Sequence, residues 1–445
     1  MTVERRIPFE SDRVEVAAVL AAGSVEAHVV YEGNGSLCWA EGESAVVSVR
    51  GSGTTLIEAG KRTEFQARSS QAAAAEAFGC IAMPEWRAYG WASFEWSHVL
   101  HGGTPSDPSE PLVYLAVPCR EIRFSGDVAT LRAEDESEVD ELQGRLTRAI
   151  AAAGTTTPSE PLVIDDREDL FGYRDAVAKA VTEIRAGSLD KVILSRVVPV
   201  EKDLDFPATY VAGRRGNTPA RSFLLRLGGW EAAGFSPEIV ASVGSDGAVS
   251  TQPLAGTRAF DGDSVFDISR REELYRDAKE VFEHAISVRL ATIEMARVCL
   301  AGTVHVADFM SVKERGSVQH LASDVAGTLR EDRTAWDALA AMFPAVTASG
   351  IPKASACEVI GRIEPGSRGL YSGAILTLDS DGGLDAALVL RSVFRRDGHT
   401  WLRAGAGIVA QSTPDREFEE TVEKLRSVSR FLVPSVSSRA ATAVQ

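Results

Sequence analysis

Apolar positions recur along the chain with two different periods. Short runs that are almost wholly apolar, or that alternate apolar with polar positions, predict strands at 191–200, 220–229 and 385–394. Longer stretches with an apolar residue every three or four positions predict helices at about 168–186, 268–299 and 414–431. Gly187 directly follows the first of these helices, as expected of a residue that ends a helix. This mixture indicates an α/β or α+β protein with large sheets.

The chain shows no convincing boundary between domains. The best candidate for a surface connection is AIAAAGTTTPSEPL, residues 150–163, and no repeat of about 20–50 residues is present. We therefore expect one large domain over residues 1–433. The final residues, 434–445, are small and polar, and we expect them to form a disordered tail.

The charge balance argues against two kinds of partner. The chain has 63 acidic and 47 basic residues, a formal net charge of −16. This charge repels nucleic acid and anionic membrane, because both are bound chiefly through Lys and Arg. No apolar run of about 18 residues is present, and the N-terminus does not resemble a signal peptide. The five cysteines are scattered without a C-x-x-C pair, which indicates reduced thiols in a cytoplasmic protein.

The segment REFEETVEK, residues 416–424, places four glutamates on the last predicted helix. On a helical wheel, the stripe expected to be buried contains Phe418, Val422 and Leu425. The glutamates that point away from it, to solvent, are Glu419 and Glu423. Beside the stripe lie Glu417, Glu420 and Lys424. Thr413 can cap this helix, and Pro414 suits its first turn.

A second carboxylate pair, Glu280 and Glu283, lies on one face of the predicted helix 268–299. Two helices that each offer E-x-x-E could supply oxygen ligands to Mg²⁺, which prefers a few carboxylates together with water and a substrate oxygen. The alternative is plain solvation, because this spacing is common in any acidic protein. The two pairs alone favour solvation, so metal binding needs further support.

Other stretches carry polar groups that could serve catalysis. Glu238 in GFSPEIV and Thr257 in PLAGTR could act as an acid and a ligand, or could simply form turns. Lys191 begins a strongly apolar strand and either extends to solvent or faces an enclosed cavity, where a lysine can act as a base. RAGAGIVA, residues 403–410, matches a dinucleotide fingerprint, but the next helix begins too late for NAD binding. The aromatic stretch 85–96 is expected to be a core strand.

Taken in order, these motifs resemble those of the chorismate-using enzymes, which include anthranilate, isochorismate, aminodeoxychorismate and salicylate synthases. The likeness spans roughly residues 165–432 and rests on KVILSR, GFSPE, PLAGTR, the Glu280/Glu283 helix, SVQHL, TASGIPK, RGLYSG, ALVLRS, RAGAGIV and REFEETVEK. Residues 1–150 fit the more variable N-terminal half of the family. The resemblance implies an α+β fold like that of anthranilate synthase component I, with two large packed β-sheets surrounded by helices and an active site in the cleft between them.

Within the family, the chain is most similar to the salicylate synthases. That resemblance implies Mg²⁺-dependent conversion of chorismate to isochorismate by addition of water, followed by loss of pyruvate to leave salicylate. It also implies a monomer that needs no glutaminase subunit.

The resemblance assigns a role to each motif residue. Lys191 would be the base that activates water for attack at ring C2, and Glu238 the acid that protonates the departing C4 hydroxyl. The ligands of Mg²⁺ would be Glu280, Glu283, Glu417 and Glu420, and the ion would hold the ring carboxylate. The enolpyruvyl carboxylate would be bound by Tyr371 and Arg391, helped by the backbone near Gly405 and Gly407. The ring site would be lined by Thr257, His320, Thr347 and Lys424.

Single positions separate the chain from its sister enzymes. Ala255 stands where aminodeoxychorismate synthases carry a lysine nucleophile, and Lys191 stands where anthranilate synthases tend to have glutamine. Isochorismate synthases share the lysine and are the closest alternative. An inactive relative that only binds an aromatic acid or a metal is a further alternative. Gln252 replaces a glutamate that salicylate synthases often show, and its side chain is expected to lie outside the reacting atoms.

Overall fold

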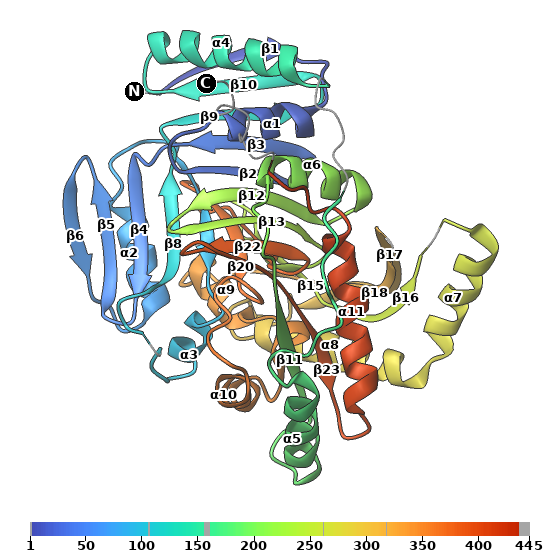
Figure 1. Cartoon of the computed structure of the whole chain (residues 1–445). Coiled ribbons are helices and arrows are strands. Elements are labelled where there is room, and N and C mark those ends of the chain that lie inside the picture. The colour runs from blue at the N-terminus through green and yellow to red at the C-terminus, as the bar shows by residue number, and fades with distance from the viewer. Residues whose placement is uncertain (1, 106, 155–160, 261, 317, 436–445) are drawn as a thin grey trace.

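Two large antiparallel sheets pack face to face, with helices on their outer sides (Figure 1). This computed structural model describes all residues except 1, 106, 155–160, 261, 317 and 436–445. The tail expected at 434–445 therefore falls almost wholly outside the described residues, as does the middle of the connection expected at 150–163. The predicted α+β architecture of two packed sheets is confirmed.

The strand order in each sheet follows from the hydrogen-bonded neighbours. Within the described residues, the first sheet has eleven strands, in the order β1 (Val3–Pro8), β10 (Val128–Ala133), β9 (Arg120–Ser125), β3 (Ser36–Glu41), β2 (His28–Gly33), β12 (Arg221–Leu227), β13 (Trp230–Ser236), β22 (Ser392–Arg396), β23 (His399–Ile408), β11 (Lys191–Pro199) and β19 (Gly350–Ile351). The second sheet has twelve, in the order β16 (Leu254–Ala259), β18 (Val318–Thr328), β15 (Ala248–Gln252), β14 (Ile239–Val243), β21 (Leu384–Leu388), β20 (Ala374–Asp379), β7 (Arg87–Ala92), β8 (Pro111–Val117), β4 (Ala45–Arg50), β5 (Gly53–Glu58) and β6 (Lys61–Phe65), with β17 (His305–Arg315) paired to β18.

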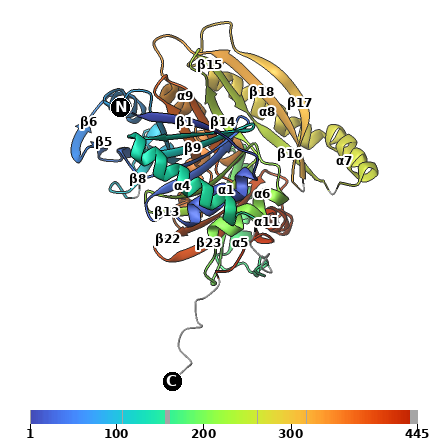
Figure 2. The same cartoon turned by 90° about the horizontal axis from the view of Figure 1, so that it is seen from above.

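Helices cover the outer faces of both sheets. Their bounds are α1 (Arg13–Ala22), α2 (Ser70–Gly79), α3 (Trp96–Leu100), α4 (Glu136–Ala152), α5 (Tyr173–Arg185), α6 (Phe206–Gly216), α7 (Ser264–Arg276), α8 (Ala278–Met295), α9 (Ala335–Met342), α10 (Lys353–Ile363) and α11 (Pro414–Ser429), with a 3₁₀ turn at Val346–Ala348. Helices α1, α4 and α6 pack on the first sheet, whereas α2, α8 and α9 pack on the second. In the view from above, α1 and α4 lie together over the first sheet, and α7 stands out from the body (Figure 2).

Strand β2 shows why so many strands are apolar at every position. Val29 and Tyr31 belong to the cluster between the sheets, whereas Val30 belongs to the cluster beneath α1, α4 and α6. Successive side chains of a strand point to opposite faces. A strand covered on both faces must therefore be apolar throughout, and its sequence loses the simple alternation of a half-exposed strand.

The predicted helix 268–299 is wrong in one respect, because it is two helices. Helix α7 ends at Arg276, and α8 begins at Ala278. Between them, Asp277 has the extended backbone of a cap residue, and its side chain accepts hydrogen bonds from the N–H groups of Lys279 and Glu280 at 3.0 and 3.3 Å. An aspartate that caps a new helix in this way also ends the previous one.

The predicted strand 385–394 is also wrong as a single strand. Its first part is β21 in the second sheet, and its last part belongs to β22 in the first sheet. Arg391 lies between them with a left-handed backbone, φ 51°. The chain crosses from one sheet to the other here, and the apolar residues on both sides of Arg391 conceal this crossing in the sequence.

Other predicted boundaries hold more closely. The strands at 191–200 and 220–229 and the helix at 414–431 are confirmed as β11, β12 and α11, and Gly187 follows α5 with φ 82°. Helix α5 begins only at Tyr173, because Asp169 accepts hydrogen bonds from the first N–H groups. The aromatic stretch 85–96 contributes the buried strand β7. Thr413 makes no side-chain capping bond to α11, contrary to the prediction.

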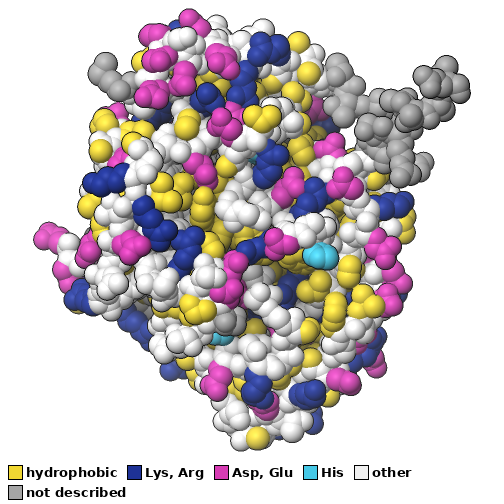
Figure 3. Space-filling view, turned by 60° about the vertical axis from the view of Figure 1, so that its left-hand side comes forward, with side chains coloured by type: hydrophobic (Ala, Val, Ile, Leu, Met, Phe, Trp, Pro, Cys, Tyr) yellow, Lys and Arg dark blue, Asp and Glu magenta, His cyan; other side chains and the backbone are white. Residues whose placement is uncertain are grey.

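The charge distribution on the surface and the limited apolar character of the described helices agree with the composition. On the face in Figure 3, acidic and basic side chains are interspersed. Among the described residues, no helix combines the length and the apolar character needed to cross a membrane.

The close approach of β7 and β8 requires glycine at position 90. A Cβ atom at Gly90 would lie 1.9 Å from the carbonyl oxygen of Tyr114 and 2.7 Å from Cα of Leu115. We expect Gly90→Ala to lower the free energy of unfolding by about 1–3 kcal/mol, because overpacking forces the backbone to shift. Thermal melting followed by circular dichroism measures the effect. The matched control is Gly79→Ala, at the end of α2, where a Cβ meets nothing within 4 Å. Equal melting temperatures for the two variants would contradict this account of β7.

Candidate active site

A cavity of about 710 Å³ is lined by residues from both sheets and from α8 and α11, a volume usual for small-molecule sites. All but one of the predicted site residues line it: Lys191, Glu238, Thr257, Glu280, Glu283, His320, Thr347, Tyr371, Arg391, Gly405, Gly407, Glu420 and Lys424. The exception, Glu417, is buried on α11 one turn before Glu420. The fold thus brings together residues that are spread over more than half of the chain.

Strand alternation aims Lys191 into this cavity. Lys191 and Ile193 of β11 line the cavity, whereas Val192 and Leu194 pack in the cluster formed with α5 and α10. The lysine side chain is only 12% exposed, and its Nζ lies 2.8 Å from Oε2 of Glu283. The interpretation of Lys191 as a residue that extends to solvent is therefore excluded.

Two glycines of β23 leave space for atoms of the adjacent strand β11. A Cβ at Gly407 would lie 3.0 Å from Cε of Lys191, and one at Gly405 would lie 2.6 Å from the carbonyl oxygen of Leu194. The ladder between β22 and β23 covers only His399 to Leu402, so the next part of β23 borders the cavity instead of another strand on that side. RAGAGIV is strand and not the start of a helix, which confirms that it is not a dinucleotide loop.

Glu238 is buried in the turn between β13 and β14, with 4% of its surface exposed. The hydroxyl of Thr347 donates a hydrogen bond to its Oε1 at 2.6 Å. Burial raises the pKa of Glu238 to about 8, against the opposing effects of the Thr347 hydrogen bond and the charge of Lys191. At neutral pH this side chain is therefore mainly a neutral carboxylic acid, the form that can donate a proton.

The predicted metal ligands meet cations around the cavity. Glu283 pairs with Lys191 and, at 3.7 Å, with Lys279. Glu280 pairs with Arg258 at 3.3 Å, and Glu420 pairs with Lys424 at 2.8 Å. Burial of a carboxylate is costly unless it is paired, and these cations supply the pairing.

Two observations show that the carboxylate set retains unmet demand for positive charge. Oε1 of Glu417 is buried without a hydrogen-bond partner. The pKa of Glu417 is raised by burial and by the charge of Glu420, and the pKa of Glu280 is raised by burial and by the charge of Glu283. In the arrangement of the described residues, however, no three His, Cys, Asp or Glu side chains converge into a group that could hold a metal ion. The donor chemistry fits a hard cation; in the present side-chain positions Lys and Arg pair with Glu280, Glu283 and Glu420, whereas Oε1 of Glu417 has no partner.

The other glutamates of α11, Glu419 and Glu423, reach solvent as the helical wheel predicts, but both also line the cavity. Phe418, Val422 and Leu425 are buried, and Glu423 is exposed. Glu419 is 45% exposed and forms a two-fold ion pair with Arg167, at 2.7 and 3.1 Å.

Arg391 is a positively charged residue of the cavity wall. Its guanidinium donates hydrogen bonds to the carbonyl oxygen of Arg315 at 3.2 Å and to Nε2 of His320 at 2.7 Å. Among the described residues, it forms an ion pair with no carboxylate. Burial, together with the charge of Arg315, lowers the pKa of Arg391 to about 10, so the group is still charged at neutral pH. A half-buried cation without an anion is an unfavourable arrangement that an anionic ligand would relieve.

His320 is held in one neutral tautomer by its two neighbours. Because Arg391 can only donate, Nε2 of His320 must accept, and Nδ1 carries the proton shared with Oγ1 of Thr257 at 3.0 Å. Burial and the charge of Arg391 move the pKa of His320 well below its usual value. Tyr371 is also buried, and burial raises the pKa of its phenol. His320 and Tyr371 therefore face the cavity as neutral groups.

The cations that reasoning from the sequence missed include Arg258, Lys279 and Arg403, which line the cavity, and Arg315, whose carbonyl oxygen accepts from Arg391. Arg258 directly follows Thr257, and Lys279 directly precedes Glu280, so position beside a motif residue could have identified both. Arg315 carried no such signal.

Two further predictions concern the sister enzymes: Ala255 lines the cavity, whereas Gln252 donates to Asp324 at 2.6 Å and is absent from the described lining.

Comparisons with known proteins show the family of the chain. Residues 28–430 match the sequence pattern of the chorismate binding enzymes. A salicylate synthase of Mycolicibacterium paratuberculosis is 43% identical over 422 residues, which cover 94% of this chain and 92% of that protein. Anthranilate synthase component 1 of Spirochaeta aurantia is 37% identical over 284 residues, which cover 64% of this chain and 58% of that protein. MenF, the menaquinone-specific isochorismate synthase of Escherichia coli, shares the fold with a TM-score of 0.74 at 23% identity, over 97% of this chain and 94% of that one.

The match extends over both sheets and includes every motif that lines the cavity, and the resemblance seen in the sequence is confirmed: the chain belongs to the family of chorismate binding enzymes.

Proposed function

We propose that this protein is a salicylate synthase, which converts chorismate to isochorismate and then to salicylate and pyruvate. The observation that carries the proposal is one cavity that holds a buried amine, a neutral carboxylic acid and an arginine without a carboxylate partner: Lys191, Glu238 and Arg391. Likeness to a salicylate synthase over 94% of the chain supports the same activity.

In the first step, water adds to ring C2 and the C4 hydroxyl leaves, and Lys191 and Glu238 act at these two positions respectively. Lys191 takes a proton from water as the water oxygen bonds to ring C2. The ring double bonds shift, and Glu238 gives its proton to the C4 hydroxyl, which leaves as water. Lys191 must first lose the proton that it shares with Glu283, and Glu238 must begin protonated, as its raised pKa allows.

Arg391 and Tyr371 hold the enolpyruvyl carboxylate in this proposal. Arg391 offers a planar set of donors suited to two carboxylate oxygens, and the buried phenol of Tyr371 can donate to the same group. Thr257, His320, Thr347 and Lys424 line the ring site. Lys424 is fixed there by Glu420 and by the carbonyl oxygen of Gly405, at 2.8 and 2.9 Å.

The second step needs mainly a fixed substrate conformation. The hydrogen on ring C2 passes to the enolpyruvyl methylene as the ether C–O bond breaks, so pyruvate leaves and the ring becomes aromatic. Enclosure between the two sheets supplies the constraint, because rate gains of this kind come from holding the reacting atoms close together.

Glu280, Glu283, Glu417 and Glu420 would hold Mg²⁺ in this proposal, with the side chains rearranged from their present pairing with Lys and Arg. The ion would neutralise the ring carboxylate of chorismate, an anion that a chain of net charge −16 otherwise repels. We further propose that a single chain suffices, because the reaction consumes water and needs no ammonia from a glutaminase.

Purified protein with chorismate and Mg²⁺ tests the function, with Lys191→Ala as the informative variant. In the wild type, we expect salicylate fluorescence with one pyruvate released per salicylate. In Lys191→Ala, the rate of isochorismate formation should fall by about 100-fold or more, because the base is lost. Lys202→Ala, at an exposed position, is the control. Isochorismate without pyruvate would favour an isochorismate synthase, and no turnover would favour a binding protein. Normal turnover in Lys191→Ala would remove the base assignment.

The Glu238 carboxyl also predicts a pH dependence. Because the first step needs protonated Glu238, the rate should fall as pH rises through about 8, the pKa of this group. Thr347→Val removes a hydrogen bond that lowers this pKa, so the fall should move to higher pH. Rates of isochorismate formation between about pH 6 and 10 measure it. Thr292→Val on α8, outside the described cavity lining, should leave the profile unchanged. An unmoved profile in Thr347→Val would exclude Glu238 as the acid.

Metal binding can be tested by comparing substitutions of two neighbouring glutamates on helix α11. Glu420→Gln should weaken Mg²⁺ binding by at least about tenfold in calorimetric titration, because a charged oxygen ligand is lost. Glu419→Gln is the control, because Arg167 already occupies both of its oxygens. Equal affinities in the two variants would mean that α11 supplies no ligand through Glu420.

A further inference from the structure

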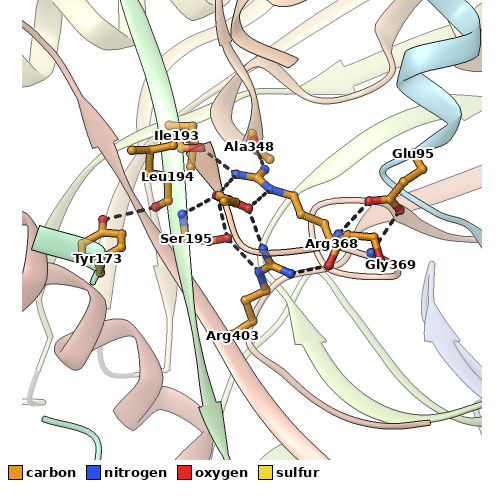
Figure 4. A network of polar contacts seen from close by, with 11 residues as sticks. Glu95, Tyr173, Ile193, Leu194, Ser195, Ala348, Arg368, Gly369 and Arg403 are labelled. Carbon is orange, nitrogen blue, oxygen red and sulfur yellow. Dashed lines mark hydrogen bonds and ion pairs between the residues drawn. The ribbon is translucent and has the colours of Figure 1, made fainter. Parts of the chain in front are cut away.

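Three motif residues that the proposed chemistry leaves without a role meet in one buried polar cluster beside the cavity (Figure 4). They are Ser195 of KVILSR, Arg368 of RGLYSG and Arg403 of RAGAGIV, and they converge on the carboxylate of Glu364. The side chains of Glu364, Arg368 and Arg403 are 2%, 1% and 3% exposed. Charges buried so completely must be paired with each other.

Both carboxylate oxygens of Glu364 are saturated. Oε1 accepts from the N–H and hydroxyl of Ser195, at 2.6 and 2.9 Å, and from Arg368 at 2.6 Å. Oε2 accepts from Arg368 at 2.9 Å and from Arg403 at 2.6 Å. These bonds and the two guanidinium charges lower the pKa of Glu364 despite its burial. The cluster is therefore an anion held between two cations, anchored to strand β11.

Arg368 reaches beyond this cluster to the main chain on two sides of the cavity. Its remaining donors bond to the carbonyl oxygens of Ile193 at 2.7 Å and of Ala348 at 2.8 Å (Figure 4). Ile193 is two residues after Lys191 on β11, and Ala348 directly follows Thr347, the hydrogen-bond donor to Glu238. One planar group thus joins the strand of the proposed base to the segment that contacts the proposed acid.

The main chain of Arg368 is fixed as well. The N–H groups of Arg368 and Gly369 donate to the two oxygens of Glu95, at 2.7 and 3.1 Å. The N–H of Tyr371 then donates to the carbonyl oxygen of Arg368 at 3.2 Å, which closes the turn that brings Tyr371 to the cavity. The same residue is therefore connected to three segments of the cavity wall.

A buried ion cluster is weak evidence for a contribution to stability, because desolvation offsets much of the attraction between the charges. Rigid placement of reacting groups, by contrast, requires a supporting group that has one possible geometry. A guanidinium that makes four hydrogen bonds in one plane meets this requirement, and a lysine in its place cannot reproduce them.

We propose that Arg368 is a positioning residue, which sets the strand of Lys191 and the Thr347 segment relative to one another and so fixes the alignment of base and acid. The catalytic consequence rests on the proposed function, whereas the structural link between Arg368 and Glu238 does not.

The test uses Arg368→Lys, which keeps the charge and loses the planar set of donors. We expect Thr347 to be displaced and its hydrogen bond to Glu238 weakened, so that the carboxyl of Glu238 titrates at higher pH than in the wild type, as in Thr347→Val. Difference infrared spectra against Glu238→Gln follow this titration without substrate. With chorismate, kcat should fall at least about tenfold while KM changes less than about threefold, because alignment and not binding is impaired.

The matched control is Arg221→Lys, which breaks another two-fold buried arginine–carboxylate pair. Arg221 bonds to Asp385 at 2.6 and 2.8 Å, with side chains 8% and 10% exposed, and lies outside the described cavity lining. It should lose melting temperature to a similar degree, yet keep the wild-type titration of Glu238 and the wild-type kcat. If Arg368→Lys fails to fold, Glu364→Gln replaces it, because this change keeps the size of the side chain and removes the charge that holds Arg368.

The outcomes separate this inference from the proposed function. A shift of the Glu238 titration in Arg368→Lys and not in Arg221→Lys supports the positioning role, even if the wild type yields another product from chorismate. A titration unchanged from the wild type, or moved equally in Arg221→Lys, overturns it. Failure of the wild type to turn over chorismate overturns the proposed function instead.

Discussion

The centre of this molecule depends on the pairing of buried charges. Glu364 is enclosed by Arg368 and Arg403, and Glu283 by Lys191 and Lys279. Removing an ion from water costs several kcal/mol in real proteins, so each of these groups is tolerated only where the fold brings it a partner. Arg391, in the cavity, instead has two neutral acceptors and no carboxylate within the described structure. The location of that imbalance identifies where an anionic ligand is needed.

Because successive side chains of a strand point to opposite faces, one strand can contribute both to the apolar core and to the active site. At the start of β11, Val192 and Leu194 pack against helices, whereas Lys191 and Ile193 face the cavity. One lysine at the start of the strand is thereby placed among carboxylates without disturbing the core. Gly407 on the neighbouring strand β23 leaves the space that this side chain occupies. Packing and chemistry thus use the two faces of the same strand.

The electrostatics of the cavity reverse those of the whole chain. The protein carries a formal net charge of −16, yet cations line the site, among them Lys191, Arg391 and Lys424. Local charge governs a buried site because nearby groups act through a low dielectric, whereas distant surface charges are screened by salt. An acidic protein can therefore bind an anionic substrate, and Glu238 can remain a neutral acid among charged neighbours.

The sequence by itself determined the fold class, the motif residues and the buried stripe of α11, because periodicity and motif order are local properties of the chain. The helical wheel correctly separated Phe418, Val422 and Leu425 from exposed Glu423. Only the tertiary structure decided the break at Asp277, the crossing between sheets at Arg391 and the partner of each charge. Lys191 and Glu283 are 92 positions apart, and Ser195 and Arg403 are 208 apart. No local pattern specifies such contacts, because they arise from the pairing of strands and the packing of helices that lie far apart in the sequence.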